Sequence, residues 1–349
     1  MSFDINTTPA GPRTRAGSRS HPTAGRDTDE FGTLEATSGA APTRWRWTAL
    51  ALATLLALVV ATGFWGDSYD DAFITYRYAR NWQERGRLQY NSGERVYGTS
   101  APGYALLLGS LARLTPAITV PAWGTLAAVA SLLAVVLLFA AALGRDGPGD
   151  AVTIAAPAAL ALLLFTVPFS IGMLGAEAYP AAALVCFGTW LLFARQKQAI
   201  AGLVLAAAAV LRLDAGLAAC ALGVGFWLSR RRFPSRLFLA GVSVLAAYLA
   251  LTFRLFGTVV PITLAVKRSE LALAGPASYG ASEWSWIGRA LPTVSAWFLL
   301  ALAGIGLLWL ARTRLALRPP VLSMGAWVLM NELLYRVLGV PFAPWYGIY

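Results

Sequence analysis

Long, almost uncharged apolar runs recur along this chain, and they leave few choices of fold. A helix that crosses a membrane needs about 20 apolar residues, and roughly 17 at the least. One soluble core could not bury so many runs near that length. The runs lie at 47–64, 102–117, 120–143, 151–169, 178–194, 199–211, 215–228, 237–256, 293–311 and 321–340. We therefore expect an all-α, polytopic membrane protein with about nine or ten helical segments, of which two or three are too short to cross.

Composition agrees with a membrane protein and argues against several soluble classes. Charged residues make up 13% of the 349 residues, whereas a soluble domain carries about 25%. The formal net charge of +11 lies mostly in short arginine-rich blocks between apolar runs, which is typical of membrane loops rather than of nucleic-acid binding. The one histidine, His21, argues against a histidine metal site or a Ser-His-Asp triad. Cys186 and Cys220 both lie in apolar runs, and we interpret them as core residues rather than as a disulfide.

The arginine-rich blocks predict which side of the membrane each segment faces, because positively charged loops stay in the cytoplasm. Residues 1–46 are polar and arginine-rich, and we expect a disordered cytoplasmic tail there. The membrane domain, 47–349, then begins with an uncleaved signal anchor. Three further cytoplasmic blocks are expected: Arg195 with Lys197, Arg230–Arg232 with Arg236, and Arg312 with Arg314 and Arg318.

Two polar excursions, 65–101 and 257–292, are predicted to be extracytoplasmic by the same rule. An even number of crossings must separate the tail from Arg195, yet five apolar runs lie between them. One run therefore does not cross. Our candidate is 102–117, because Pro102 and Arg113 closely limit its length.

A helix break is predicted where the runs 199–211 and 215–228 meet. Each run is too short to cross, and Arg212-Leu213-Asp214 lies between them. Such half-length helices end inside a membrane only where protein or water receives their polar ends. Ionisable residues at that depth indicate function, but Arg212 and Asp214 are equally explained by a buried ion pair that seals the break. Glu177 is a weaker candidate, as a carboxylate at a helix N-terminus.

The first excursion carries the residues best suited to chemistry. Asp67, Asp70 and Asp71 follow the first apolar run, and 72–84 has helical character. Neighbouring carboxylates can serve as a general base toward a hydroxyl group or hold a divalent cation through oxygen ligands. The alternative is structural: surface ion pairs with nearby arginines and a capped helix.

The predicted helix of this excursion also has an aromatic and basic face. Phe73, Tyr76, Arg77 and Arg80 share that face by their spacing, which suits a helix in the headgroup layer. Arg77, Arg80 and Lys267 can hold a phosphate group. A carboxylate base with a phosphate clamp is what sugar transfer from a lipid-linked phosphosugar requires.

Two stretches of this excursion resemble a known family. Residues 70–81 read DDAFITYRYARN and residues 90–100 read YNSGERVYGTS. Both are similar to the first external loop of bacterial GT-C glycosyltransferases, in particular the group with the mycobacterial terminal arabinofuranosyltransferases. Weaker similarities follow at 171–177, 211–216, 256–267 and 341–346. The departures at Ser92, Tyr97 and Ile262 leave the sugar and the acceptor undefined.

The resemblance implies a GT-C-like helical bundle with a helical first extracytoplasmic loop, in the inner or plasma membrane. It implies an inverting transfer from a polyprenyl-phosphate sugar to an envelope glycan, lipid or protein acceptor on the extracytoplasmic side. Asp70 or Asp71 would be the catalytic base. The donor phosphate would be bound by Lys267 with one or more of Arg77, Arg80 and Arg212. The other candidate site residues are Asp67, Tyr76, Glu177, Asp214 and Tyr346.

The resemblance indicates no metal requirement, but Asp70 and Asp71 would be the ligands if Mg or Mn binds. Membrane lipids are expected partners, and nucleic acid is not. Because members of the family are usually longer, we expect the chain to be an N-terminal portion or a truncated relative.

Two other functions are compatible with the sequence. A transporter or flippase of a lipid-linked sugar would need charged residues along a path through the spans, and the apolar runs contain few. A non-catalytic envelope assembly protein would not need the carboxylates of the first excursion. Substituting Asp70 and Asp71 therefore separates an enzyme from an assembly protein.

Overall fold

The computed structural model describes residues 70–143, 174–266 and 318–338, together with Ser269 and a few positions between 51 and 68. Within these residues the chain is helical and contains no strand, as the sequence predicts. The expected tail, the runs 151–169 and 293–311 and most of the run 47–64 lie outside the described residues.

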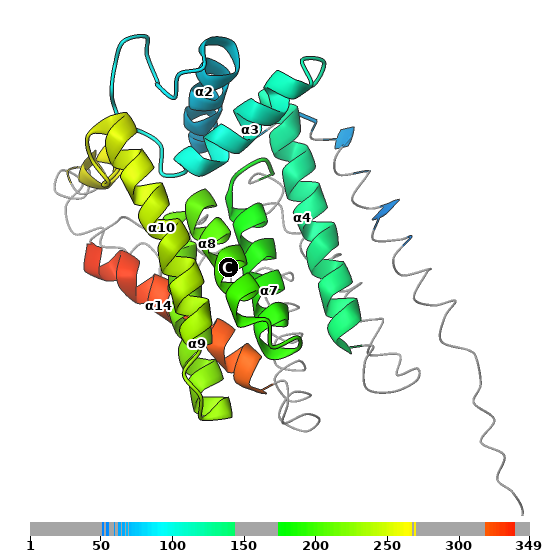
Figure 1. The fold of residues 1–349 in the computed structure, drawn as a ribbon. Coiled ribbons are helices and arrows are strands. Elements are labelled where there is room, and N and C mark those ends of the chain that lie inside the picture. Colours follow the sequence, from blue (N-terminus) through cyan, green and yellow to red (C-terminus); the bar gives the residue numbers. More distant parts are fainter. Residues whose placement is uncertain are drawn as a thin grey trace, which may run out of the picture. The chain divides into compact units, whose positions relative to one another are not determined.

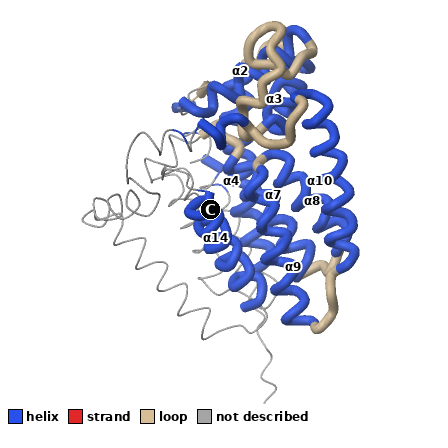
Figure 2. The backbone as a smooth tube through the Cα atoms, turned by 90° about the vertical axis from the view of Figure 1, so that its left-hand side faces the viewer, coloured by secondary structure: helices blue, strands red, loops and turns tan. Residues whose placement is uncertain are grey.

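The described helices follow the apolar runs and the predicted helix of the first excursion. They are α2 (Asp70–Arg85), α3 (Pro102–Leu114), α4 (Val120–Leu143), α7 (Ala178–Phe193), α8 (Gln198–Leu211), the 3-10 turn η1 (Leu213–Ala215), α9 (Gly216–Arg230), α10 (Ser235–Phe256) and α14 (Arg318–Leu338). In both views α2 and α3 lie together at one end of α7, α8 and α10 (Figures 1 and 2). Helix α8 packs against both α7 and α10, α4 packs on α7, and α14 packs on α9.

Two described helices are long and apolar enough to cross a membrane, namely α10 and the Pro319–Leu338 part of α14. Shorter apolar helices are formed by α7, α8 and the first part of α4. The 13 residues of α3 extend only about 20 Å at 1.5 Å per residue, short of a hydrocarbon core of about 30 Å. Because α7, with 16 residues, is also shorter than that core, the prediction that the run 102–117 does not cross stays a prediction.

Side chains on the inner face of α2 hold the return segment, residues 87–100, against the helix. Thr75 Oγ1 lies 2.9 Å from Thr99 Oγ1 in a buried hydrogen bond. The Tyr78 hydroxyl donates to the Val96 carbonyl at 2.6 Å. The Asn81 amide donates to two carbonyls of the segment at 2.8 and 2.9 Å. Part of the stretch that resembles the glycosyltransferase loop therefore stabilises the packing of the return segment on α2.

The prediction that one face of α2 carries Phe73, Tyr76, Arg77 and Arg80 is wrong for Tyr76. Phe73 and both arginines are exposed, whereas Tyr76 is only 4% exposed. Its hydroxyl lies so close to Gly124 and Gly175 that a Cβ at either glycine would overlap it. Because three residues advance an α-helix by less than one full turn, Tyr76 falls on the packed side of the helix.

Helices α2 and α3 approach each other closely at Gly109. A Cβ there would overlap the main-chain oxygen of Ala79 and lie 3.0 Å from Cδ1 of Trp82. We expect Gly109→Ala to destabilise the protein by about 1–3 kcal/mol, the usual cost of overpacking. The matched control is Gly325→Ala in α14, where nothing lies within 4 Å of the added carbon and the gain in helix propensity is up to about 1 kcal/mol. Thermal unfolding of both variants in one detergent checks this, and equal midpoints would contradict the close approach.

Candidate functional site

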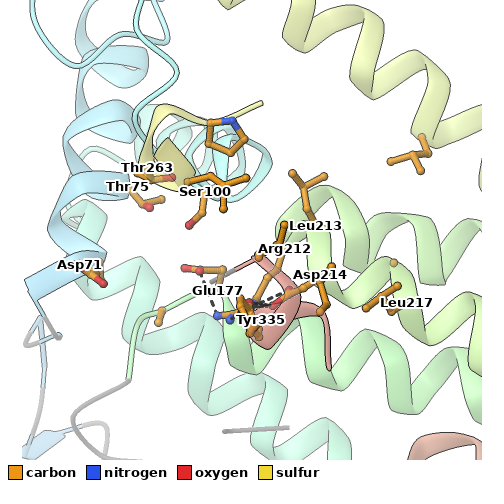
Figure 3. Close-up of a pocket in the computed structure, with 18 of the residues that line it drawn as sticks. Asp71, Thr75, Ser100, Glu177, Arg212, Leu213, Asp214, Leu217, Thr263 and Tyr335 are labelled. Carbon is orange, nitrogen blue, oxygen red and sulfur yellow. Dashed lines mark hydrogen bonds and ion pairs between the residues drawn. The ribbon is translucent and has the colours of Figure 1, made fainter. Parts of the chain in front are cut away.

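A cavity of about 500 Å³ lies where α2, the start of α7, the break between α8 and α9, and α14 come together. Residues 261–264, at the start of the second excursion, also line it (Figure 3). Its polar lining residues are Asp71, Thr75, Ser100, Glu177, Arg212, Asp214, Thr263 and Tyr335. Four of these are predicted site residues that lie far apart in the sequence: Asp71, Glu177, Arg212 and Asp214.

The predicted helix break is confirmed, and it forms one wall of the cavity. Helix α8 ends at Leu211, and Arg212 adopts an extended conformation with φ −151° and ψ 113°. The 3-10 turn η1 follows, and α9 begins at Gly216. This change of backbone direction presents both Arg212 and Asp214 to the cavity.

Arg212 is the centre of a buried hydrogen-bond network. Its Nε donates to both carboxylate oxygens of Asp214 at 3.0 and 3.1 Å. Its Nη1 pairs with Oε1 of Glu177 at 3.5 Å, and its Nη2 donates to the Tyr335 hydroxyl at 3.3 Å. The Tyr335 hydroxyl in turn donates to Asp214. Because Arg212 is only 7% exposed, these partners supply the compensation that a buried charge needs.

Glu177 occupies the N-cap position of α7, as its predicted role at a helix N-terminus requires, but its side chain makes no capping hydrogen bond. It faces the guanidinium of Arg212 instead. Burial raises the pKa of the Glu177 carboxyl, the Arg212 guanidinium opposes that rise, and the carboxylates of Asp214 and Asp71 add to it. Asp71 is therefore within electrostatic range of this network.

Tyr335 and Asn331 are site residues that the sequence analysis missed. Both lie on α14, and with its nitrogen toward Asp214 the Asn331 amide donates to the Asp214 carbonyl at 3.2 Å. In that orientation its oxygen accepts from the Trp327 indole at 2.9 Å. The signal was present in the sequence, because polar or hydrogen-bonding residues spaced four apart in an apolar helix lie on one face.

Asp71 is an exposed carboxylate in the first turn of α2, on the cavity wall. None of the ion pairs among the described residues includes it. The structural alternative, an ion pair of Asp71 with Arg77 or Arg80, is therefore not found. Asp70 begins α2, but its side chain lies outside the described residues.

Arg77 and Arg80 are not among the residues that line the cavity. The Arg77 guanidinium lies 4.3 Å from the centre of the Tyr90 ring and donates to the Asn91 amide oxygen at 2.8 Å. Arg80 is exposed and pairs with Glu84 at 3.7 Å. The structure thus gives both arginines partners within the first excursion, and their role toward a donor phosphate stays a prediction.

Tyr76 does not line the cavity either. Burial raises its pKa to about 12, so the hydroxyl keeps its proton at neutral pH. Three predicted site residues, Asp67, Lys267 and Tyr346, lie outside the described residues. Within the described part of the chain, no group of three or more His, Cys, Asp or Glu side chains is arranged to hold a metal ion. The prediction that Asp70 and Asp71 hold Mg or Mn stays untested.

The two predicted extracytoplasmic excursions meet in the structure. The Ile262 amide donates to the Tyr97 carbonyl at 2.8 Å, and the Tyr97 ring stacks on Phe256 with centroids 4.9 Å apart. Arg95 donates to the main-chain oxygen of Arg254 at 3.0 Å. The segment that leads to Lys267 therefore starts beside the return segment of the first excursion and contributes Thr263 to the cavity.

Fold and site together define a protein that is helical throughout its described elements and has a cavity lined by both polar and apolar side chains. Comparisons of the chain with models of protein families, with curated proteins and with solved structures find no match.

Proposed function

We propose that the chain is a polytopic integral-membrane glycosyltransferase of the GT-C type. It transfers a sugar from a polyprenyl-phosphate donor to an envelope acceptor on the extracytoplasmic side of the membrane. The observation that carries the proposal is the exposed Asp71 carboxylate on the wall of a cavity of about 500 Å³. Such a volume is in the range of small-molecule sites, and the carboxylate belongs to the stretch that resembles the glycosyltransferase loop.

In the proposed reaction the Asp71 carboxylate accepts the proton of an acceptor hydroxyl as that oxygen attacks the anomeric carbon. The bond from the anomeric carbon to the phosphate oxygen breaks on the opposite face, which inverts the configuration. A positively charged side chain is needed to stabilise the departing phosphate. We assign this role to Lys267. The segment that leads to Lys267 begins beside the return segment of the first excursion, where the Ile262 amide donates to the Tyr97 carbonyl, and this supports the assignment.

Exposed apolar side chains support the location in a membrane. On α10, Leu239 is 72% and Val242 61% exposed; on α14, Leu329 is 71% and Val337 73% exposed. Large apolar side chains exposed along whole helices indicate contact with lipid or another protein. The length of both helices favours lipid.

We expect residues 65–101 to face the outside of the cell. In a background with Cys186→Ala and Cys220→Ala, a cysteine introduced by Ser92→Cys lies at an exposed turn and should react with an impermeant thiol reagent in intact cells. The matched control is Ser229→Cys, exposed at the end of α9 beside the arginine block at 230–232, which should react only after lysis. The reverse pattern of labelling would invert the topology and remove the proposed site from the extracytoplasmic side.

The proposal is tested by sugar transfer in membranes that contain the chain. A panel of polyprenyl-phosphate pentoses and hexoses serves as donors, and radiolabel in extracted envelope glycan and lipid is the readout. Repeating the assay with a chelator, and then with Mg or Mn restored, shows whether the reaction uses a divalent cation. Absence of transfer from every donor, in membranes that hold folded protein, would count against the enzyme and favour an assembly role.

A further inference from the structure

We infer that the described part of the cavity is the acceptor subsite, and that it binds a neutral, hydroxyl-rich headgroup carried on an apolar chain. This inference rests on the proposed function and names the substrate class of the same site. A glycolipid has this chemistry. An anionic headgroup, such as the donor phosphate, does not.

The charges on the cavity wall carry the first step. Among the described residues that line it, the carboxyl groups of Asp71, Glu177 and Asp214 stand against one guanidinium, that of Arg212. The described part of the lining is thus negative even when one carboxyl group carries a proton. A phosphate placed here would meet like charges, which costs binding energy.

Arg212 is oriented toward its neighbours on the wall, because each of its three nitrogens bonds to one of them. Asp214 accepts from Nε, Glu177 pairs with Nη1, and the Tyr335 hydroxyl accepts from Nη2. These three contacts hold the guanidinium in one orientation on the cavity wall. We therefore infer that Arg212 is a positioning residue for the two carboxylates, in place of the phosphate-binding role that the family resemblance implies.

The polar part of the cavity lining suits a sugar. Thr75, Ser100 and Thr263 come from α2, the return segment and the second excursion, and Figure 3 shows them grouped, with Asp71 on the same side of the cavity. Hydroxyl groups both donate and accept hydrogen bonds, and ionised carboxylates accept them. A neutral sugar offers both kinds of partner without adding charge.

Apolar side chains also line the cavity, and Figure 3 shows Leu217 on the side away from Asp71. The lining leucines come from the break, α9, α10, the start of the second excursion and α14: Leu213, Leu217, Leu245, Leu264, Leu334 and Leu338. An alkyl or prenyl chain gains free energy by leaving water for such a surface. A ligand that satisfies both the polar and the apolar lining at once is an amphiphile with an uncharged polar head.

The interpretation of Cys220 as a core residue is wrong, because it is exposed and lines this cavity, and it therefore provides a direct probe of occupancy. The chain has two cysteines, so Cys186→Ala leaves Cys220 as the one thiol of the full-length protein. With this variant in phosphatidylcholine nanodiscs, the rate of labelling by N-ethylmaleimide is measured with octyl glucoside, octyl phosphate or glucose, each below its micellar concentration. Octyl glucoside should slow the labelling. Octyl phosphate, with the same chain, should need an at least about tenfold higher concentration for half protection, and glucose should protect weakly because it lacks the chain.

A charge variant tests the reason for this preference. Asp71→Asn should reduce the ratio of the concentrations at which octyl phosphate and octyl glucoside give half protection of Cys220. The control is Glu94→Gln, which removes an exposed carboxylate outside the cavity lining and should leave this ratio unchanged. Equal or better protection by octyl phosphate would overturn the inference. So would protection by neither amphiphile, or a Cys220 that does not react in the empty protein. None of these measurements requires turnover, so the inference can fail while sugar transfer is still observed, and the reverse holds as well.

Discussion

Asp71→Asn is expected to lower the rate of sugar transfer by about 10²-fold or more, the usual scale for loss of a general base. The amide keeps the shape of the carboxylate but cannot take the proton of the acceptor hydroxyl. Because Asp71 is exposed and belongs to none of the ion pairs among the described residues, the free energy of unfolding should change by no more than about 0.5 kcal/mol. Initial rates in membranes with matched protein levels, together with thermal unfolding of the purified variant, check both statements.

Two companion variants make this result specific. Glu84→Gln removes a carboxylate from the outer side of the same helix, where it pairs with Arg80, and it should leave transfer at the level of the unmodified protein. Asp70→Asn removes the neighbouring carboxylate, and the variant with the larger loss identifies the base. Full transfer by both aspartate variants would contradict a catalytic role for this pair and leave an assembly protein as the better explanation.

Local features of the fold could be predicted from the sequence because short-range patterns determine them. The apolar runs that form α8 and α9 are each too short to cross a membrane, and charged residues lie between them. These two features predicted the break that the structure shows. Residues 91–94 form a turn, in which the Glu94 amide donates to the Asn91 carbonyl at 3.2 Å and Gly93 has φ +87°; the sequence Asn-Ser-Gly is typical of such a turn. Glycine is the residue that adopts such a φ most readily.

Contacts between distant segments could not be predicted in the same way. Tyr335 bonds Asp214 across 121 positions of sequence, and no periodicity within α14 specifies which helix it packs on. Periodicity also misled at Tyr76, because residues three apart share a face only approximately, and the burial of that side chain depends on two glycines in other segments. The resemblance of the first excursion located Asp71, but the partners that surround it come from the tertiary packing.

Replacing Arg212 by leucine is expected to destabilise the protein by about 3–5 kcal/mol, the scale for removing one partner of a buried ion pair. Glu177 and Asp214 would lose their shared countercharge, while both side chains are mostly buried, at 13% and 9% exposed. Tyr335→Phe should cost less, about 1–3 kcal/mol, because it removes only the hydroxyl that Asp214 accepts from. Thermal or denaturant unfolding in one detergent gives these differences, and an Arg212→Leu variant as stable as the unmodified protein would show that the network does not hold the break together.

Arg212→Lys then separates the two roles that the sequence allows for this residue. Lysine keeps the charge but lacks the planar guanidinium, which contacts Asp214, Glu177 and Tyr335 at the same time. If Arg212 positions the two carboxylates, stability falls while the KM for the donor stays unchanged. If Arg212 binds the donor phosphate, the KM rises together with the loss of stability, since a lysine cannot make the bidentate contact. The charges on the cavity wall favour the first outcome, because a guanidinium already held by two carboxylates has little attraction left for a third anion.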